Sequence, residues 1–231
     1  MDIFDNESFY VFLNEYADQS KTRIYRGAAS DKYTLIPSIG RQLMRKDNKT
    51  SLNETDEGLI FRHFKQRAQP FLAKDVDDMN LLAIAQHHGL PTRLLDWTFN
   101  PLAAAYFAVE DSIVQPADPK KQTLNSVIYV YDKPTKAVIN KKFKSIVVDK
   151  LEFFIPNYND GRIVNQNGLF TVHPFPWTEL IDENIKTISI DLEYRRDLRK
   201  LLNRLGVNKS TVYPGLDGVA EHIKWMQTNF Y

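Results

Sequence analysis

Residues 81–110, LLAIAQHHGLPTRLLDWTFNPLAAAYFAVE, constrain the fold of this chain more than any other segment. Their apolar runs predict a buried helix, a tight turn, a short buried strand and a second buried helix. Polar and aromatic side chains nevertheless stand among these runs: His87, His88, Thr92, Arg93, Asp96, Trp97 and Thr98. Because a charge buried without a partner costs several kcal/mol, we expect Arg93 and Asp96 to be paired, either with each other or with a ligand. The segment is therefore expected to lie at the centre of the molecule.

Local signals mark the ends of the two helices in this segment. Gly89 stands where a helix C-terminus favours glycine, and Pro91 follows shortly after, so the first helix is expected to end at His88. Asn100 can cap the second helix, and Pro101 suits its first position, where a missing N–H carries no penalty. Small side chains let this second helix lie close to its neighbours: Ala103, Ala104, Ala105 and Ala108.

The remainder of the chain predicts an α+β fold. Apolar residues at helical spacing predict helices at residues 5–17, 57–72, 191–205 and 217–227. Asp5 or Asn6 can cap the first of these. Alternating, β-rich segments predict strands at residues 23–27, 126–131, 145–148, 151–155, 162–172 and 186–190. Irregular structure is expected at residues 28–55 and 111–125, with a turn at residues 157–161. Because helices and strands alternate without a regular βαβ rhythm, we expect one domain, residues 1–231, with a helix-rich N-terminal half, including a helix within residues 1–19, on a small mixed or antiparallel β-sheet.

Composition limits the classes of function. The chain has 231 residues, a net charge of +1 and no cysteine. Near-neutral charge gives no strong nucleic-acid signal and none for a membrane surface. A solvated surface explains the basic residues more simply than nucleic-acid binding does: Lys141, Lys142, Lys144, Arg195 and Arg196. Without cysteine there is no disulfide and no thiol catalysis, which fits a cytoplasmic protein, and no apolar run approaches the roughly 20 residues that span a bilayer.

The motifs of several large enzyme classes are missing from the sequence. It contains no GxxxxGK[ST] phosphate loop, no GxGxxG, no GxSxG nucleophile elbow and no HExxH. His87 and His88 are adjacent, so on a helix they point about 100° apart and cannot chelate one metal ion. An alternative role for both is a favourable interaction with the helix C-terminus. We therefore expect no metal site.

One long run of residues resembles a known family. Residues 86–98, QHHGLPTRLLDWT, with residues 100–102, NPL, and 105–108, AYFA, resemble the core of the FRG domain family. The family is named for a Phe-Arg-Gly motif, which here reads Tyr25-Arg26-Gly27. Weaker similarity at residues 166–170 and 213–218 extends the resemblance to about residues 20–225.

A more distant resemblance, to the ADP-ribosyltransferase fold, implies both a fold and an activity. Arg26, Thr98 and Gln166 lie in this order along the chain on three predicted strands, an order similar to the Arg, Ser-Thr-Ser and Glu strands of ADP-ribosyltransferases. It implies NAD as substrate, with the arginine on a phosphate or ribose and an acid that stabilises the oxocarbenium-like charge as nicotinamide leaves. Thr98 stands alone, however, and Gln166 cannot supply a negative charge. Asp96 or Glu152 can supply the acid; otherwise the chemistry is weak or the domain only binds a nucleotide.

Together these residues form a predicted site. Its catalytic residues are Arg26, Thr98, Gln166 and Asp96. Its NAD contacts are Arg26, Gly27, His88, Arg93 and Trp97. Each group has a structural alternative: a surface arginine at a strand end for Arg26, a buried amide for Gln166, an ion pair of Arg93 with Asp96, and a core position for Trp97. The prediction requires Arg26, the corner from Asp96 to Thr98, and Gln166 to surround one concave pocket.

The predicted function is that of a cytoplasmic, NAD-binding, ADP-ribosyltransferase-like enzyme acting as a toxin or anti-phage effector. Its expected partners are the nucleotide ligand and either a macromolecular acceptor or an antitoxin. The alternative is a nucleotide-binding module without catalysis.

Overall fold

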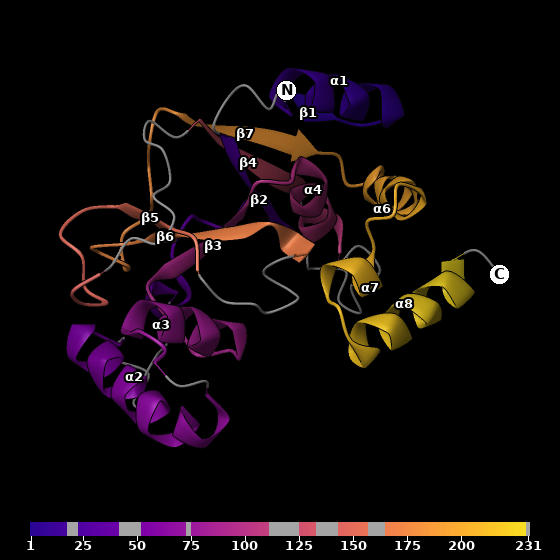
Figure 1. Cartoon of the computed structure of the whole chain (residues 1–231). Coiled ribbons are helices and arrows are strands. Elements are labelled where there is room, and N and C mark those ends of the chain that lie inside the picture. The colour runs from indigo at the N-terminus through magenta and orange to yellow at the C-terminus, as the bar shows by residue number, and fades with distance from the viewer. Residues whose placement is uncertain are drawn as a thin grey trace.

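The computed structural model describes residues 1–17, 23–41, 52–72, 75–110, 125–132, 143–156 and 165–229 (Figure 1). The helices in this part of the chain are α1 (Asn6–Tyr16), α2 (Glu54–Ala68), α3 (Asp78–His87), α4 (Pro101–Val109), α6 (Arg195–Arg204), α7 (Lys209–Val212) and α8 (Leu216–Asn229). Short 3-10 helices are η1 (Ser38–Gly40) and η2 (Gln69–Phe71). The strands are β1 (Asp2–Ile3), β2 (Arg23–Ala28), β3 (Leu94–Thr98), β4 (Ser126–Asp132), β5 (Glu152–Phe154), β6 (Gly168–Val172) and β7 (Ile185–Ile190).

The strands form one mixed sheet in the order β1-β7-β4-β2-β3-β6-β5. The edge strand β1 runs parallel to β7, and the other neighbours are antiparallel. The predicted α+β fold with a mixed sheet is therefore confirmed. None of the helices in the described ranges combines the length and apolar character needed to cross a bilayer.

Two groups of helices cover different parts of the sheet (Figure 1). One core cluster joins α1, α4 and α6 to β1, β2, β4 and β7, and a second joins α2 and α3 to β3, β5 and β6. Successive strand residues point to opposite faces. Leu94 accordingly belongs to the second cluster, whereas Leu95 packs in a third cluster with Trp97 and Leu169. Strand β3, which lies inside the sheet, is thus buried on both faces at Leu94 and Leu95.

The alanine-rich helix α4 lies unusually close to β2. A Cβ atom added at Gly27 would lie 1.9 Å from the carbonyl oxygen of Ala104. Only a glycine in the strand and small residues on the helix allow this approach. Gly27, predicted to contact NAD, therefore has a packing role of its own.

The cap signals in the sequence correspond to real helix ends. Asp5 accepts a hydrogen bond from the Ser8 amide at the start of α1. Asn100 accepts one from the Leu102 amide at the start of α4. Gly89 follows α3 with a φ of +87°, the left-handed conformation expected of a helix-ending glycine.

Several predicted elements differ from the structure. Residues 145–148 form no strand, because their alternating apolar side chains instead pack against the second cluster through Ile146 and Val148. Strand β1 and helix α7 were not predicted; both are too short for a periodic signal. The predicted loop at residues 111–125 and the turn at residues 157–161 fall almost wholly outside the described residues.

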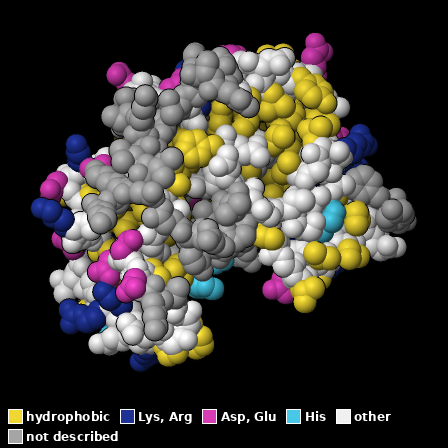
Figure 2. Space-filling model, in the orientation of Figure 1, with side chains coloured by type: hydrophobic (Ala, Val, Ile, Leu, Met, Phe, Trp, Pro, Cys, Tyr) yellow, Lys and Arg dark blue, Asp and Glu magenta, His cyan; other side chains and the backbone are white. Residues whose placement is uncertain are grey.

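Helix α2 presents a charged outer surface. Figure 2 shows side chains of both signs gathered over it at the lower left. Lys65 on this helix forms an exposed ion pair with Asp78 at 2.5 Å. Pairs of this kind contribute about 1 kcal/mol or less, so the attachment of α2 to the sheet must rest on its inner face.

Candidate functional site

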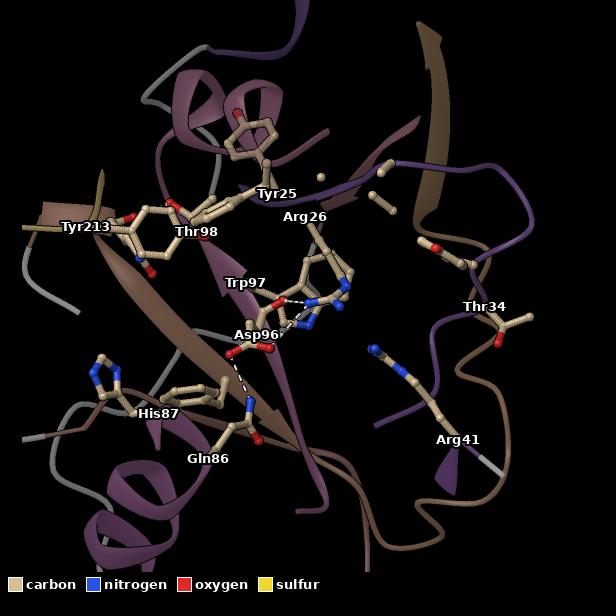
Figure 3. Close-up of a pocket in the computed structure, with 17 residues that line it drawn as sticks. Tyr25, Arg26, Thr34, Arg41, Gln86, His87, Asp96, Trp97, Thr98 and Tyr213 are labelled. Carbon is tan, nitrogen blue, oxygen red and sulfur yellow. Dashed lines mark hydrogen bonds and ion pairs between the residues drawn. The ribbon is translucent and has the colours of Figure 1, made fainter. Parts of the chain in front are cut away.

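A pocket opens where strands β2 and β3 diverge. Their described residues pair only at Tyr25 and Thr98, whereas β3 and β6 pair along the whole of β3. The pocket has a volume of about 600 Å³ and is lined by the consecutive residues 25–29 and 96–98. Because consecutive strand residues point to opposite faces, a cavity that touches all of them lies in the gap between the strands. Side chains from α3, α4 and β6 complete the wall (Figure 3).

Arg26 bridges this gap between the strands. Its Nη1 donates to the backbone oxygen of Asp96 at 2.7 Å and lies 3.5 Å from Asp96 Oδ2. The side chain thus occupies a backbone acceptor that a strand ladder would otherwise use, and it is only 17% exposed. Burial lowers the pKa of the Arg26 guanidinium, Asp96 raises it, and Arg41 lowers it again. Arg26 is therefore a partly desolvated cation on the pocket wall.

Asp96 presents an open but oriented carboxylate. Its side chain is 62% exposed, and Gln86 Nε2 donates to Oδ1 at 2.8 Å. The Gln86 oxygen in turn accepts a hydrogen bond from the Thr92 hydroxyl. This chain of contacts links the end of α3 to β3 and holds the carboxylate in place (Figure 3). An acid that is fixed on one side and open on the other can act on a bound ligand.

Thr98 lines the pocket, but its hydroxyl is engaged in the protein. It is 2% exposed, donates to the Gln166 backbone oxygen at 2.5 Å and accepts from the Asn100 amide at 2.9 Å. These contacts join the end of β3 to the segment before β6 and to the start of α4. Thr98 therefore shapes this corner of the pocket.

Gln166 also reaches the pocket, but not from a strand. It lies in a short helical turn that ends at Asn167, whose φ is +48°, so the predicted strand position is wrong. Its Nε2 donates to the Val212 backbone oxygen at 3.1 Å. The side-chain nitrogen of Gln166 therefore has the structural role given above as the alternative: it satisfies a backbone carbonyl group. Glu152, the other candidate acid, lies on β5 and is not among the pocket-lining residues.

Arg93 is paired elsewhere, which corrects the prediction of a pair with Asp96 or a ligand. Its side chain is 0% exposed and lies 2.6 Å from Glu57 on α2, whose side chain is 3% exposed. Nε donates to Glu57 Oε1 at 3.1 Å, and Nη1 donates to the His173 backbone oxygen at 3.1 Å. Arg93 is not among the described residues that line the pocket. It fastens α2 to the sheet.

His88 lies on the surface, and Trp97 lies in the core. His88 is exposed just after α3 and does not line the pocket, although the neighbouring His87 does. Trp97 is 3% exposed, and its Nε1 donates to Thr171 Oγ1 at 3.0 Å, so it is a core residue whose edge reaches the pocket. In the described part of the chain, no group of three or more His, Asp or Glu side chains is placed to hold a metal ion.

Several pocket residues were not assigned to the predicted site, and Gln86, Tyr213 and Arg41 are the most relevant of them. Gln86 was part of the recognised run, and a polar residue late in an apolar helix was a usable signal. Tyr213 was assigned to a structural turn, yet its ring packs edge-on against Phe107 at 6.2 Å and its hydroxyl donates to Glu110 Oε2 at 2.9 Å. Arg41 lies in a segment expected to be irregular, and no local pattern distinguishes it.

The pocket therefore combines three kinds of group. Arg26 and Arg41 supply positive charge, Asp96 supplies a carboxylate, and aromatic rings such as Tyr213 supply flat apolar walls. Guanidinium groups suit phosphates, and aromatic rings suit bases. The combination fits an anionic ligand that carries an aromatic ring.

Comparisons with known proteins recognise one region of the chain. Residues 21–116 match the sequence model of the FRG domain. No curated protein and no solved structure matches the chain. The matched residues include β2, α2, α3, β3 and α4, and hence Arg26, Arg41 and Asp96. The predicted extension of the resemblance to about residue 225 stays a prediction.

Proposed function

We propose that this FRG-domain protein binds NAD in the pocket between β2 and β3 and cleaves the bond between nicotinamide and ribose, as an ADP-ribosyltransferase-like enzyme. The observation that carries the proposal is the Asp96 carboxylate, 62% exposed on the pocket wall and oriented by Arg26 and Gln86. The predicted strand order placed a glutamine where an acid is needed. Asp96 supplies that acid from the neighbouring strand.

Arg26 binds the negative part of the ligand. A guanidinium can hold two phosphate oxygens, or a phosphate and a ribose hydroxyl, in one plane. Its bond to the Asp96 backbone, at 2.7 Å, uses one of its five donors and leaves others for the ligand. Partial burial strengthens those contacts because less water competes for them.

Asp96 stabilises the reacting ribose. Nicotinamide leaves with the electron pair of the C1′–N1 bond, which makes the sugar oxocarbenium-like and positively charged. A fixed carboxylate close to this charge lowers the barrier. Water or an acceptor nucleophile then forms the new bond to C1′ and loses its proton. The products are nicotinamide and either free ADP-ribose or a modified acceptor.

The surrounding residues hold this geometry. Thr98 and Gln166 tie the corner of β3 to β6 and to the end of α7. Tyr213, whose ring packs against Phe107, lies beside Thr98 (Figure 3) and supplies an aromatic wall that suits a flat ring such as nicotinamide. In a cell, loss of NAD or modification of a macromolecule would make the protein a toxin or anti-phage effector, and an antitoxin would be its natural inhibitor.

The test is nicotinamide release from NAD by the purified protein, measured by chromatography. We expect turnover by the wild type and a loss of at least roughly 100-fold in Asp96→Asn, because an uncharged amide cannot stabilise the cation. Asp149→Asn, at an exposed aspartate away from the pocket, is the matched control and keeps full activity. NAD that stays intact at high protein concentration with acceptors present contradicts the proposal.

A second candidate is a nucleotide-binding module without catalysis. It is favoured by two observations: Gln166 stands at the acid's expected position, and Arg26 lies 3.5 Å from the Asp96 carboxylate and offsets its charge. Calorimetry with NAD and ADP-ribose separates the two candidates. Tight binding without nicotinamide release supports the module, whereas release that depends on Asp96 supports the enzyme.

A further inference from the structure

Arg41 lies on a turn at the edge of the pocket, and packing and hydrogen bonds fix the position of this turn. It follows η1, whose Ile39 is 1% exposed and donates its amide to the Thr92 backbone oxygen at 3.2 Å. Gly40 is packed so closely that an added Cβ would lie 1.9 Å from the Pro176 backbone oxygen. The Arg41 guanidinium is itself oriented, because Nε donates to the Ile36 backbone oxygen at 2.8 Å. The protein therefore presents this side chain in a defined direction.

That direction is into the pocket, towards Arg26. Both arginines line the cavity, and Figure 3 shows the Arg41 guanidinium reaching towards the centre from the side opposite Tyr213. Among the described residues, no carboxylate forms an ion pair with Arg41. Asp96 already pairs with Arg26, so the charged side chains of the wall carry one positive charge more than negative.

Two guanidinium groups that face one cavity repel each other. Burial lowers the pKa of Arg26, Asp96 opposes this effect, and Arg41 adds to the lowering. The arrangement is unfavourable in the empty protein and becomes favourable when an anion with more than one charged oxygen group lies between the two cations.

We propose that Arg41 and Arg26 form a two-armed clamp for a diphosphate, so that the ligand class of this pocket is a nucleoside diphosphate in which the diphosphate links two halves. The inference rests on the proposed function and deepens it. Arg26 binds one phosphate from β2, and Arg41 binds the other from the turn after η1. A mononucleotide would reach only one arm.

The layout of the pocket gives the diphosphate a direction. Thr98 and Tyr213 lie at one end, Arg41 and Thr34 at the other, and Asp96 between them (Figure 3). With the diphosphate at the arginine end, one half of the ligand extends past Asp96 towards the Tyr213 ring. The other half extends towards the rim, where Tyr33 exposes 62% of its surface beside Thr34. A flat base can stack on that ring.

The experiment is calorimetric titration of the full-length chain with ADP-ribose, AMP and adenosine, comparing the wild type with Arg41→Gln. We expect Arg41→Gln to weaken ADP-ribose binding by roughly tenfold to 100-fold, the range for losing hydrogen bonds to a charged group. The affinity for adenosine, which has no phosphate, should change less than about twofold, within the ordinary effect of a surface substitution. AMP should lose less affinity than ADP-ribose.

Two further variants test whether the loss of binding is specific to the guanidinium of Arg41. Arg41→Lys keeps the charge but not the planar guanidinium. Its affinity for ADP-ribose should therefore lie between that of the wild type and that of Arg41→Gln. Arg62→Gln, at an exposed arginine on α2 outside the pocket, is the matched control and should leave binding unchanged. Unfolding curves recorded for each variant separate lost contacts from lost structure.

The possible results separate this inference from the proposed function. If wild type binds ADP-ribose and Arg41→Gln binds it equally well, the clamp is overturned while NAD binding stands. If wild type binds neither NAD nor ADP-ribose but binds another nucleoside diphosphate whose diphosphate links two halves, such as UDP-glucose, with Arg41 dependence, the clamp stands and the proposed activity fails. If wild type binds none of these diphosphates, both are overturned.

Discussion

Two arginine–carboxylate pairs lie close together in this protein and have opposite surroundings. Arg93 and Glu57 form a sealed pair, with side chains 0% and 3% exposed. Arg26 and Asp96 form an open pair, with side chains 17% and 62% exposed. Arg93 and Asp96 are only three residues apart on the chain, yet neither pairs with the other.

The difference between the pairs comes from what covers each one. Helix α2 lies over Arg93 and supplies Glu57 from its inner face. The divergence of β2 from β3 leaves Asp96 beside a cavity. A sealed pair can only stabilise the fold, whereas an open pair can exchange its contacts for a ligand. Exposure of the carboxylate therefore distinguishes the two roles.

The largest expected effect is on the sealed pair. Glu57→Gln should lower the free energy of unfolding by about 3–5 kcal/mol, because the buried Arg93 charge loses its buried carboxylate partner and keeps only the exposed Glu54, 3.6 Å away. Chemical denaturation measures this change. Glu54→Gln is a matched control on the same helix, since Glu54 lies 3.6 Å from Arg93 but its side chain is 61% exposed. That control should change stability by about 1 kcal/mol or less.

The open pair provides the contrast. Asp96→Asn should change the free energy of unfolding by about 1 kcal/mol or less, as for other exposed pairs. If Asp96→Asn lowered the free energy of unfolding as much as Glu57→Gln does, both pairs would serve the fold, and exposure of the carboxylate would not distinguish them.

The next effect concerns His173, which lies near both arginines. Burial, then Arg26 and Arg93, lowers the pKa of its ring from 6.5 to about 4. The unfolded chain therefore binds a proton between these pH values that the folded protein does not. Stability from this group is fully present above pH 6.5 and is lost as the pH falls towards about 4. The total loss is about 3 kcal/mol.

Denaturation curves between pH 7.5 and pH 4.5 (roughly the range over which a histidine titrates) measure the effect. His222, whose pKa burial and Arg199 also lower, contributes in the same direction. His173→Gln is therefore compared with His222→Gln, and the pH slope should flatten more in the first. An unchanged slope in His173→Gln would mean that the ring is not held neutral beside the arginines.

A small effect on stability is also expected at Gln86, which orients Asp96. Gln86→Ala removes the 2.8 Å bond to the carboxylate and should lower stability by about 1 kcal/mol. On the proposed function it also slows nicotinamide release, by less than Asp96→Asn does, because the charge remains but its position is less fixed. His88→Ala, at an exposed neighbour outside the pocket, should change neither quantity. Equal losses at both positions would mean that this end of α3 matters only for folding.

Much of the fold could be predicted from local patterns. The ends of α1, α3 and α4 follow from Asp5, Gly89 and Asn100, because a cap depends on contacts within a few residues. The α+β class and most strands follow from apolar periodicity in the same way. The run of costly polar residues among apolar ones also drew attention to the segment that supplies Asp96, Trp97 and Thr98 to the pocket lining.

Only the tertiary structure decided which of those polar residues meet, and with what. Arg93 pairs with Glu57, 36 residues away, and Arg26 pairs with Asp96, 70 residues away. Arg41 lines the same pocket as Arg26. Such pairings depend on how α2 covers the sheet and on where β2 and β3 separate, and neither is a local property. Capping and periodicity act over a single turn or strand, so they determine the elements; side-chain partners from distant elements are determined by packing.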